Sequence, residues 1–200
     1  MKCIKTCAVI ISMVCFSVSS FAQRIKVADG DLSALKDVKS MNIEFTYENM
    51  RVGKFKNESD YISKKTEEYN KKESGKGDHW AKEWVNDRKE KYEPKFIDLF
   101  EKGSEMTLNT TKKDAKYTLI YKTTSIEPGF NVGVMRKNAE TDAEAWVVET
   151  ASQKVVAKLT VDNAQGRTFW GADYETGGRI AECYADAGKA LGYYIRKKAD

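Results

Sequence analysis

The sequence is poor in the residues that most often carry chemistry or crosslinks. Its 200 residues include one histidine, four cysteines and two prolines. A general base or a histidine-activated nucleophile would have to be built around His79 alone. A zinc site would have to depend on carboxylates, because histidine and cysteine are the usual ligands. The sequence therefore predicts no metal, no cofactor and no catalytic residues.

The first residues have the pattern of a secretory signal peptide. Two lysines precede a mostly apolar run over residues 7–18, and a small-x-small site follows at Ser20 and Ala22. We predict cleavage after Ala22, which gives a signal peptide over 1–22 and a single α+β domain over 23–200. The apolar run is too short to span a bilayer in the mature chain.

Cleavage would leave the mature chain with one cysteine. Cys3, Cys7 and Cys15 lie in the signal peptide and Cys183 alone remains. No intramolecular disulfide can then form, so core burial must stabilise the exported chain. A lipid anchor would need a modified cysteine after a small residue, whereas Cys15 follows Val14.

The charge balance gives no sign of a nucleic-acid partner. Without Lys2 and Lys5, 32 basic residues stand against 30 acidic ones, a net charge of about +2. Nucleic-acid-binding proteins show a strong basic surplus or a clustered basic patch. We therefore expect no nucleic-acid partner.

Alternating apolar residues predict the strands. The pattern occurs at residues 41–47, 117–122, 145–148 and 155–161, and residues 131–135 are expected to continue the sheet. The last two long strands form a hairpin around a turn at Thr150 to Gln153, and Pro128-Gly129 suits a type II turn. Residues 29–39 are expected to form a lead-in loop or a short helix.

Three helices are predicted between and after these strands. The expected ranges are 60–72, capped by Ser59; 78–103, kinked near Glu93 by Pro94 and ended by Gly103; and 179–198. The fold class is then α+β. A single mostly antiparallel sheet packs against a long C-terminal helix, and a charged two-helix segment lies between the first and second strands.

Aromatic residues are the candidates for binding. Trp80 and Trp84 lie one turn apart, with Arg88 one turn further on, and could form an exposed strip or the inward face of their helix. We favour the inward face. Phe169 and Trp170, in a glycine-rich loop, are better surface candidates because they follow no strand or helix period, although they could also plug the sheet edge.

Two other features invite a chemical interpretation. Cys183 could be a nucleophile beside His79, but its position on the last helix favours a small packed residue. Glycines before that helix match neither the spacing of a P-loop nor that of a dinucleotide fingerprint, although a phosphate or carboxylate could sit at the helix start. They are Gly166, Gly171, Gly177 and Gly178.

The carboxy-terminal part resembles a known family. The segments GFNVGV, DAEAWVVETASQKVVAKLTVDN and GGRIAECYADAGKALGYYI are similar to the second half of a bacterial envelope domain family. The family includes uncharacterised outer-membrane-associated proteins and, remotely, the periplasmic domain of the curli-secretion channel and the TolB amino-terminal domain. The resemblance implies a periplasmic or outer-membrane-associated protein with a role in assembly or binding.

Two functions from different classes remain. The first is a non-catalytic envelope protein that binds or helps to assemble another envelope component, or associates with itself. The second is an exported hydrolase that uses carboxylates near the glycine-rich loop, such as Asp162 and Glu175, on a glycan or peptide. We favour the first, because no catalytic constellation is found.

Overall fold

The computed structural model describes residues 24–111, 114–132, 135–166 and 176–199. The predicted signal peptide lies outside these residues. So do Phe169, Trp170, Gly171 and Glu175.

The described residues form strands and helices in an α+β order. The order is β1 Arg24–Gly30, a short 3-10 turn Ser33–Leu35, β2 Ser40–Thr46, β3 Arg51–Val52, α1 Glu58–Lys72, α2 Lys76–Asp87, a π-helical turn Arg88–Tyr92, α3 Glu93–Ser104, β4 Thr107–Asn109, β5 Tyr117–Glu127, β6 Phe130–Val132, β7 Met135–Lys137, β8 Glu140–Glu149, β9 Val155–Gln165 and α4 Thr176–Ala199.

One mixed sheet forms the body of the molecule. Its strands follow the order β1-β9-β8-β5-β2-β4, and β3 pairs with the end of β5. The long pairings β1–β9, β5–β8 and β8–β9 are antiparallel, whereas β5–β2, β2–β4 and β3–β5 are parallel. The predicted α+β class and the β8–β9 hairpin are confirmed. Short β3 and β4, and β1 with its largely exposed residues, were not predicted.

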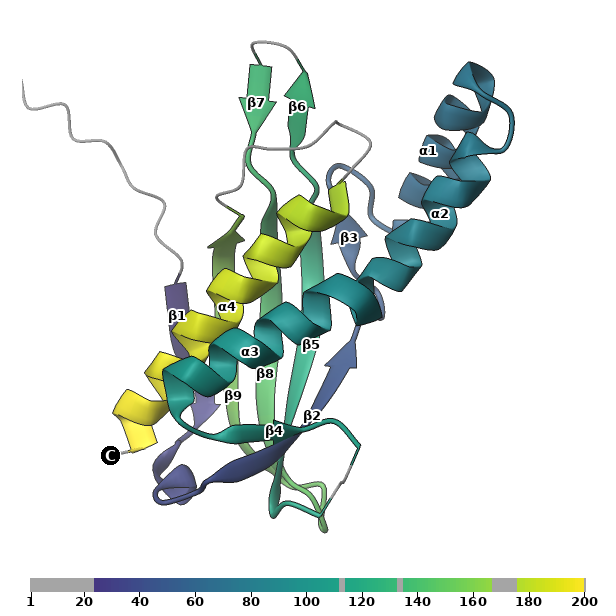
Figure 1. Cartoon of the computed structure of the whole chain (residues 1–200). Coiled ribbons are helices and arrows are strands. Elements are labelled where there is room, and N and C mark those ends of the chain that lie inside the picture. The colour runs from purple at the N-terminus through teal and green to yellow at the C-terminus, as the bar shows by residue number, and fades with distance from the viewer. Residues whose placement is uncertain (1–23, 112–113, 133–134, 167–175, 200) are drawn as a thin grey trace, which may run out of the picture.

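Helices α3 and α4 cover one face of this sheet (Figure 1). An aromatic layer lies between them and the strands, in which the Phe96 ring contacts Tyr121 at 4.4 Å and Tyr92 stacks on Tyr184 at 5.1 Å between centroids. Gly188 and Gly192, four residues apart on α4, face the backbone of α3 so closely that a Cβ at either would overlap a carbonyl oxygen. The last helix therefore packs on α3 as well as on the sheet.

The predicted second helix is continuous, and its distortion lies in the turn before Glu93 and Pro94. The distorted turn is the π-helical turn Arg88–Tyr92, which contains Glu90, the residue four before Pro94, whose carbonyl receives no N–H from the proline. Gly103 does not end the helix, which runs to Ser104 and closes with Glu105 at φ 62°. Ser59 lies inside α1, whose N-cap is Asn57.

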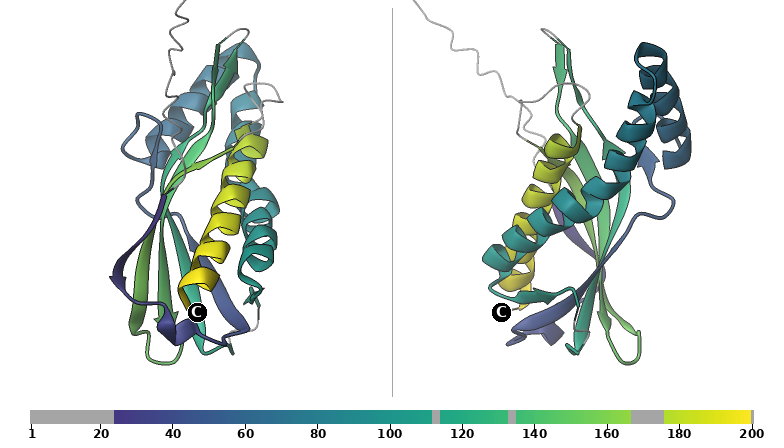
Figure 2. Two further views of the ribbon diagram at one scale, coloured as in Figure 1. Left: turned by 90° about the vertical axis from the view of Figure 1, so that its left-hand side faces the viewer. Right: turned by 45° about the vertical axis from the view of Figure 1, so that its right-hand side comes forward.

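Two hairpins project from the same end of the body (Figures 1 and 2). Helices α1 and α2 form one, and the small sheet of β6 and β7, which extends β5 and β8, forms the other. Residues 131–135, expected to continue the main sheet, therefore belong in part to a separate sheet. None of the described helices combines the length and apolar composition needed to cross a membrane.

Candidate binding groove

A groove of about 320 Å³ lies where β2 leaves β4. Its walls come from three parts of the chain: β2 itself, the helical segment around the π-turn, and the start of the loop after β4. The lining residues are Ile43, Glu44, Phe45, Thr46, Lys89, Glu93 and Thr110.

The groove follows a strand edge that is paired on one side. β4 pairs with residues 40–42 of β2, whereas β5 pairs with residues 42–46. Within the described ranges, residues 43–46 therefore have β5 as their only strand neighbour. The Lys39 carbonyl accepts the Thr107 N–H on the β4 side at 2.9 Å. Peptide groups alternate along a strand, and the Asn42–Asn109 pairing is the last that β4 makes with β2. The Ile43 carbonyl and the Phe45 N–H and carbonyl therefore face the β4 side beyond its last paired residue.

The core holds this edge in place. The Phe45 ring lies edge-on to Phe96 at 5.4 Å and to Tyr121 at 6.0 Å. Ile43 is 4% exposed. An incoming chain would therefore meet a preformed strand, which lowers the entropic cost of binding.

A buried carboxylate borders the groove. Glu93 is 7% exposed, and its oxygens accept hydrogen bonds from the Tyr47 hydroxyl at 3.4 Å and from the Lys89 ammonium at 2.8 Å. The Lys89 side chain is 78% exposed, so one of the two partners can move into solvent. Burial raises the pKa of Tyr47 far above its usual value, with smaller contributions from Tyr184 and Glu93, so this hydroxyl stays a donor.

The π-helical turn connects this carboxylate to α1. The Arg88 guanidinium lies 4.4 Å from the centroid of the Tyr47 ring and forms an ion pair with Glu58. The same Glu58 oxygen accepts the indole N–H of Trp84. π-Turns occur often at functional sites, and this one directs Arg88 and Lys89 to two different carboxylates beside the groove.

The inward interpretation of Trp80 and Trp84 is the one that the structure supports. They are 2% and 3% exposed and pack with Tyr61 and Tyr69 between α1 and α2, with ring centroids 5.0 to 5.7 Å apart. Neither indole forms an exposed strip. The other two predicted binding residues, Phe169 and Trp170, lie outside the described residues.

His79 and Cys183 do not share a site. His79 is exposed on the projecting α2, whereas Cys183 is fully buried in α4, where its thiol donates to the Arg179 carbonyl at 3.5 Å. Burial raises the pKa of the Cys183 thiol well above its usual value. A buried protonated thiol is a poor nucleophile.

The distance between the carboxylates of the proposed pair, Asp162 and Glu175, is not defined by the described residues, because only Asp162 is among them. Asp162 is half-buried on β9, opposite Arg24 of β1, and its carboxylate accepts from the Thr160 hydroxyl at 3.4 Å. Its predicted partner Glu175 lies outside the described residues. No group of three or more acidic, histidine or cysteine side chains that could hold a metal occurs in the ranges that the structure describes.

Sequence reasoning missed the groove residues Glu93, Lys89 and Thr110. Glu93 had no signal in the sequence: it stands nine residues after Trp84, on the opposite side of an ideal helix, and the π-turn between them changes that register. Residues 43–46 of β2 have an open edge only because β4 is too short to pair with them, and no pattern within β2 itself indicates this.

Trp146 was also missed as a surface residue. It is half-buried on the sheet face opposite the helices, with the Lys158 ammonium 4.2 Å from its ring centroid.

Comparison with solved structures finds loose similarities of fold. A PelC dodecamer from Paraburkholderia phytofirmans is 11% identical with a TM-score of 0.36, over 83% of this chain and 97% of that chain. Protein XCC0632 from Xanthomonas campestris, of the family DUF330, is 10% identical with a TM-score of 0.40, over 80% and 84%. No family model and no curated protein matches the chain. These similarities bring no function to this chain, and the resemblance to the curli-secretion and TolB domains stays a prediction.

Proposed function

We propose that this chain is a non-catalytic protein of the bacterial cell envelope that binds an extended segment of another envelope protein along the free edge of β2. The signal-peptide pattern over residues 1–22 supports the location. The observation that carries the proposal is the groove beside residues 43–46, where the strand lacks a second neighbour among the described residues.

Strand addition explains the composition of the groove. An incoming extended segment would hydrogen-bond to the Ile43 carbonyl and to the N–H and carbonyl of Phe45, which gives affinity without sequence specificity. Its alternate side chains would supply the specificity, with an apolar residue toward Phe45 and a basic residue toward Glu93. The Lys89 partner of Glu93 is exposed and can be displaced into solvent, so the buried Glu93 carboxylate favours a basic residue in the partner.

Peptide selection on the purified protein tests the proposal. A library of random peptides displayed on phage is enriched on the chain, and the affinity of the selected peptides is measured by fluorescence anisotropy. Thr110→Trp places a large side chain in the groove from an exposed loop position, and Ser152→Trp places the same residue on the exposed β8–β9 turn.

Thr110→Trp should weaken binding about tenfold or more, because it occupies the volume that the peptide needs. Ser152→Trp should leave binding unchanged. Glu93→Gln should weaken the peptides that contain lysine or arginine and spare neutral ones. Selected peptides that bind equally well to Thr110→Trp would refute the groove as their site.

A further inference from the structure

The β6–β7 hairpin exposes apolar side chains that the groove does not use. Phe130, Val132 and Met135 are 37%, 54% and 62% exposed, and they are three of the five exposed large hydrophobic residues among those described. All three lie on one pair of three-residue strands that projects beyond the sheet (Figure 1). Apolar residues grouped in this way mark an interaction surface.

The β6–β7 hairpin is a direct continuation of the central strands β5 and β8, and hydrogen bonds hold its base. β6 follows β5 through Pro128-Gly129, with Gly129 at φ 65°, and β7 leads into β8. At its base a single carboxylate, that of Glu127, accepts from the Gly129 N–H at 3.2 Å and from the Lys137 ammonium at 2.7 Å. The apolar residues are therefore presented at a fixed place.

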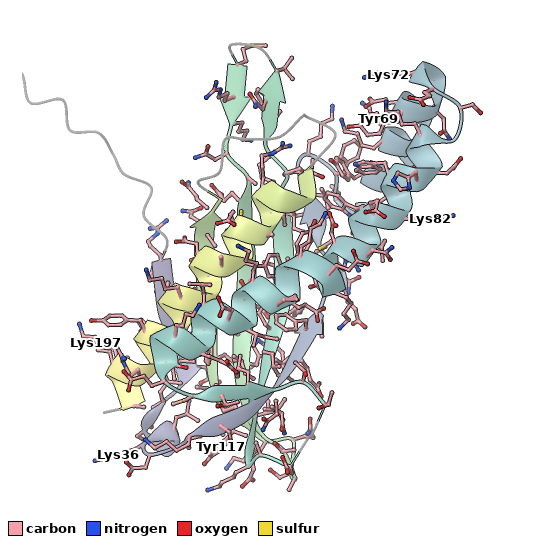
Figure 3. All side chains as sticks on the ribbon, viewed as in Figure 1. Lys36, Tyr69, Lys72, Lys82, Tyr117 and Lys197 are labelled. Atoms are coloured by element: carbon pink, nitrogen blue, oxygen red, sulfur yellow. The ribbon has the colours of Figure 1, made fainter. Side chains whose placement is uncertain are left out.

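Basic residues accompany the apolar ones at this end of the molecule. Arg136 is exposed next to Met135 on β7. The tip of the α1–α2 hairpin lies at the same end and carries Lys72, whereas Lys36 and Tyr117 lie at the opposite end (Figures 2 and 3). The two projections thus lie at one end of the molecule, one with exposed apolar side chains and Arg136 and the other with Lys72.

We propose that the β6–β7 hairpin is a lipid-contact site that inserts Phe130, Val132 and Met135 into the interface of an anionic phospholipid bilayer. A few apolar side chains on six strand residues are too small a surface for a stable protein interface. A bilayer interface requires no shape-matched partner, and its binding strength grows with buried apolar area and with the attraction between basic residues and anionic headgroups. Arg136 and Lys72 supply that attraction.

Flotation with lipid vesicles tests the site. The purified protein is mixed with vesicles of equal parts phosphatidylglycerol and phosphatidylcholine, or of phosphatidylcholine alone. Co-flotation should occur with the anionic vesicles and weaken as salt is added. The double variant Val132→Asp with Met135→Asp should reduce partitioning about tenfold or more, since two charges would have to enter the interface.

Two control variants distinguish lipid binding by the β6–β7 hairpin from non-specific lipid binding by other exposed apolar residues and from binding in the groove. Tyr193→Asp changes a residue of similar exposure, 53%, on α4 and should float as the wild type does. Thr110→Trp should also float normally, so a failure of the groove proposal leaves this result untouched. Every variant is first shown to have the wild-type thermal midpoint.

A fluorescent label reports the contact directly. An environment-sensitive dye on Met135→Cys should shift its emission to the blue with anionic vesicles, whereas the same dye on Ser152→Cys should not; buried Cys183 stays unlabelled. Absence of flotation, flotation that survives the two aspartates, or a dye at position 135 that stays in water would each overturn the proposal. The first of these outcomes would leave a protein partner as the reason for the exposed apolar residues.

Discussion

The carboxylate of Asp87, at the end of α2, lies against Gly177 in the first turn of α4. Asp87 is 5% exposed and forms an ion pair with Lys91 at 2.6 Å. A Cβ at position 177 would overlap Asp87 Oδ2. Since the N-terminus of a helix carries unpaired N–H groups and partial positive charge, a carboxylate there stabilises it. The contact joins the helix that leads into the groove to the helix that covers the sheet.

Gly177→Ala should destabilise the fold by about 1–3 kcal/mol, because the added methyl group displaces a buried carboxylate. Gly178→Ala is the matched control, since nothing lies within 4 Å of a Cβ there. In a helix, that alanine should be neutral or stabilising by up to about 1 kcal/mol. Urea unfolding followed by circular dichroism measures both. Equal midpoints for the two variants would contradict the Asp87 contact.

Glu58→Gln should cost about 1–3 kcal/mol and shift the tryptophan emission to longer wavelengths. Glu58 pairs with Arg88 and accepts from the Trp84 indole, and both charged side chains are mostly buried. Glu67→Gln breaks an exposed pair with Lys71 and should leave the unfolding midpoint unchanged. A Glu58 variant as stable as the Glu67 variant would remove the support that we assign to the π-turn.

Trp80→Ala should unfold the α1–α2 hairpin before the body. Its aromatic cluster with Tyr61 and Tyr69 is the hairpin's own core, and the hairpin projects away from the sheet (Figure 1). Hydrogen exchange measured by mass spectrometry should rise across α1 and α2 while β5, β8 and α4 keep their protection. A rise shared equally by β5 would show instead that the hairpin and the sheet unfold as one unit.

The protein should lose stability in alkali above about pH 10. Burial raises the pKa of Tyr92, Tyr121 and Tyr184, so their folded pKa values lie above the unfolded value of 10.0. The neutral form is favoured in the folded state, so the full stability is present below about pH 10 and declines as pH rises toward the folded values. Absorbance at about 295 nm should show exposed tyrosines titrating first and a later step that coincides with unfolding. A smooth titration of all tyrosines near their ordinary pKa without unfolding would contradict their burial.

Patterns confined to one element were enough to predict much of the fold. The alternation in β8 and β9 and the apolar stripe of α4 depend on side chains that face a single core, and the structure confirms them. β1 escaped prediction because its burial pattern is mostly exposed. The packing of Gly188 and Gly192 on α3 also escaped, since a close helix contact depends on a partner distant in sequence.

The candidate groove was harder to predict for a related reason. The sequence correctly placed Phe45 on an apolar strand face, but the open edge beside it exists because β4 pairs with only three residues of β2. Glu93 was noted only as the place of a kink. Its burial beside Tyr47 depends on the π-turn, which changes the positions of the following residues around the helix axis. The spacing of apolar residues in the sequence does not predict such a turn.

Photo-crosslinking in producing cells tests the central claim most directly. A photoreactive phenylalanine analogue is placed at Thr46 or Thr110 in the groove, or at Ser152 on the far turn as the control. The groove positions should yield a covalent adduct with another envelope protein after irradiation, and the adduct should disappear when a selected peptide competes. Position 152 should yield none. Groove positions that yield only the uncrosslinked chain, or the same adducts as position 152, would contradict the account.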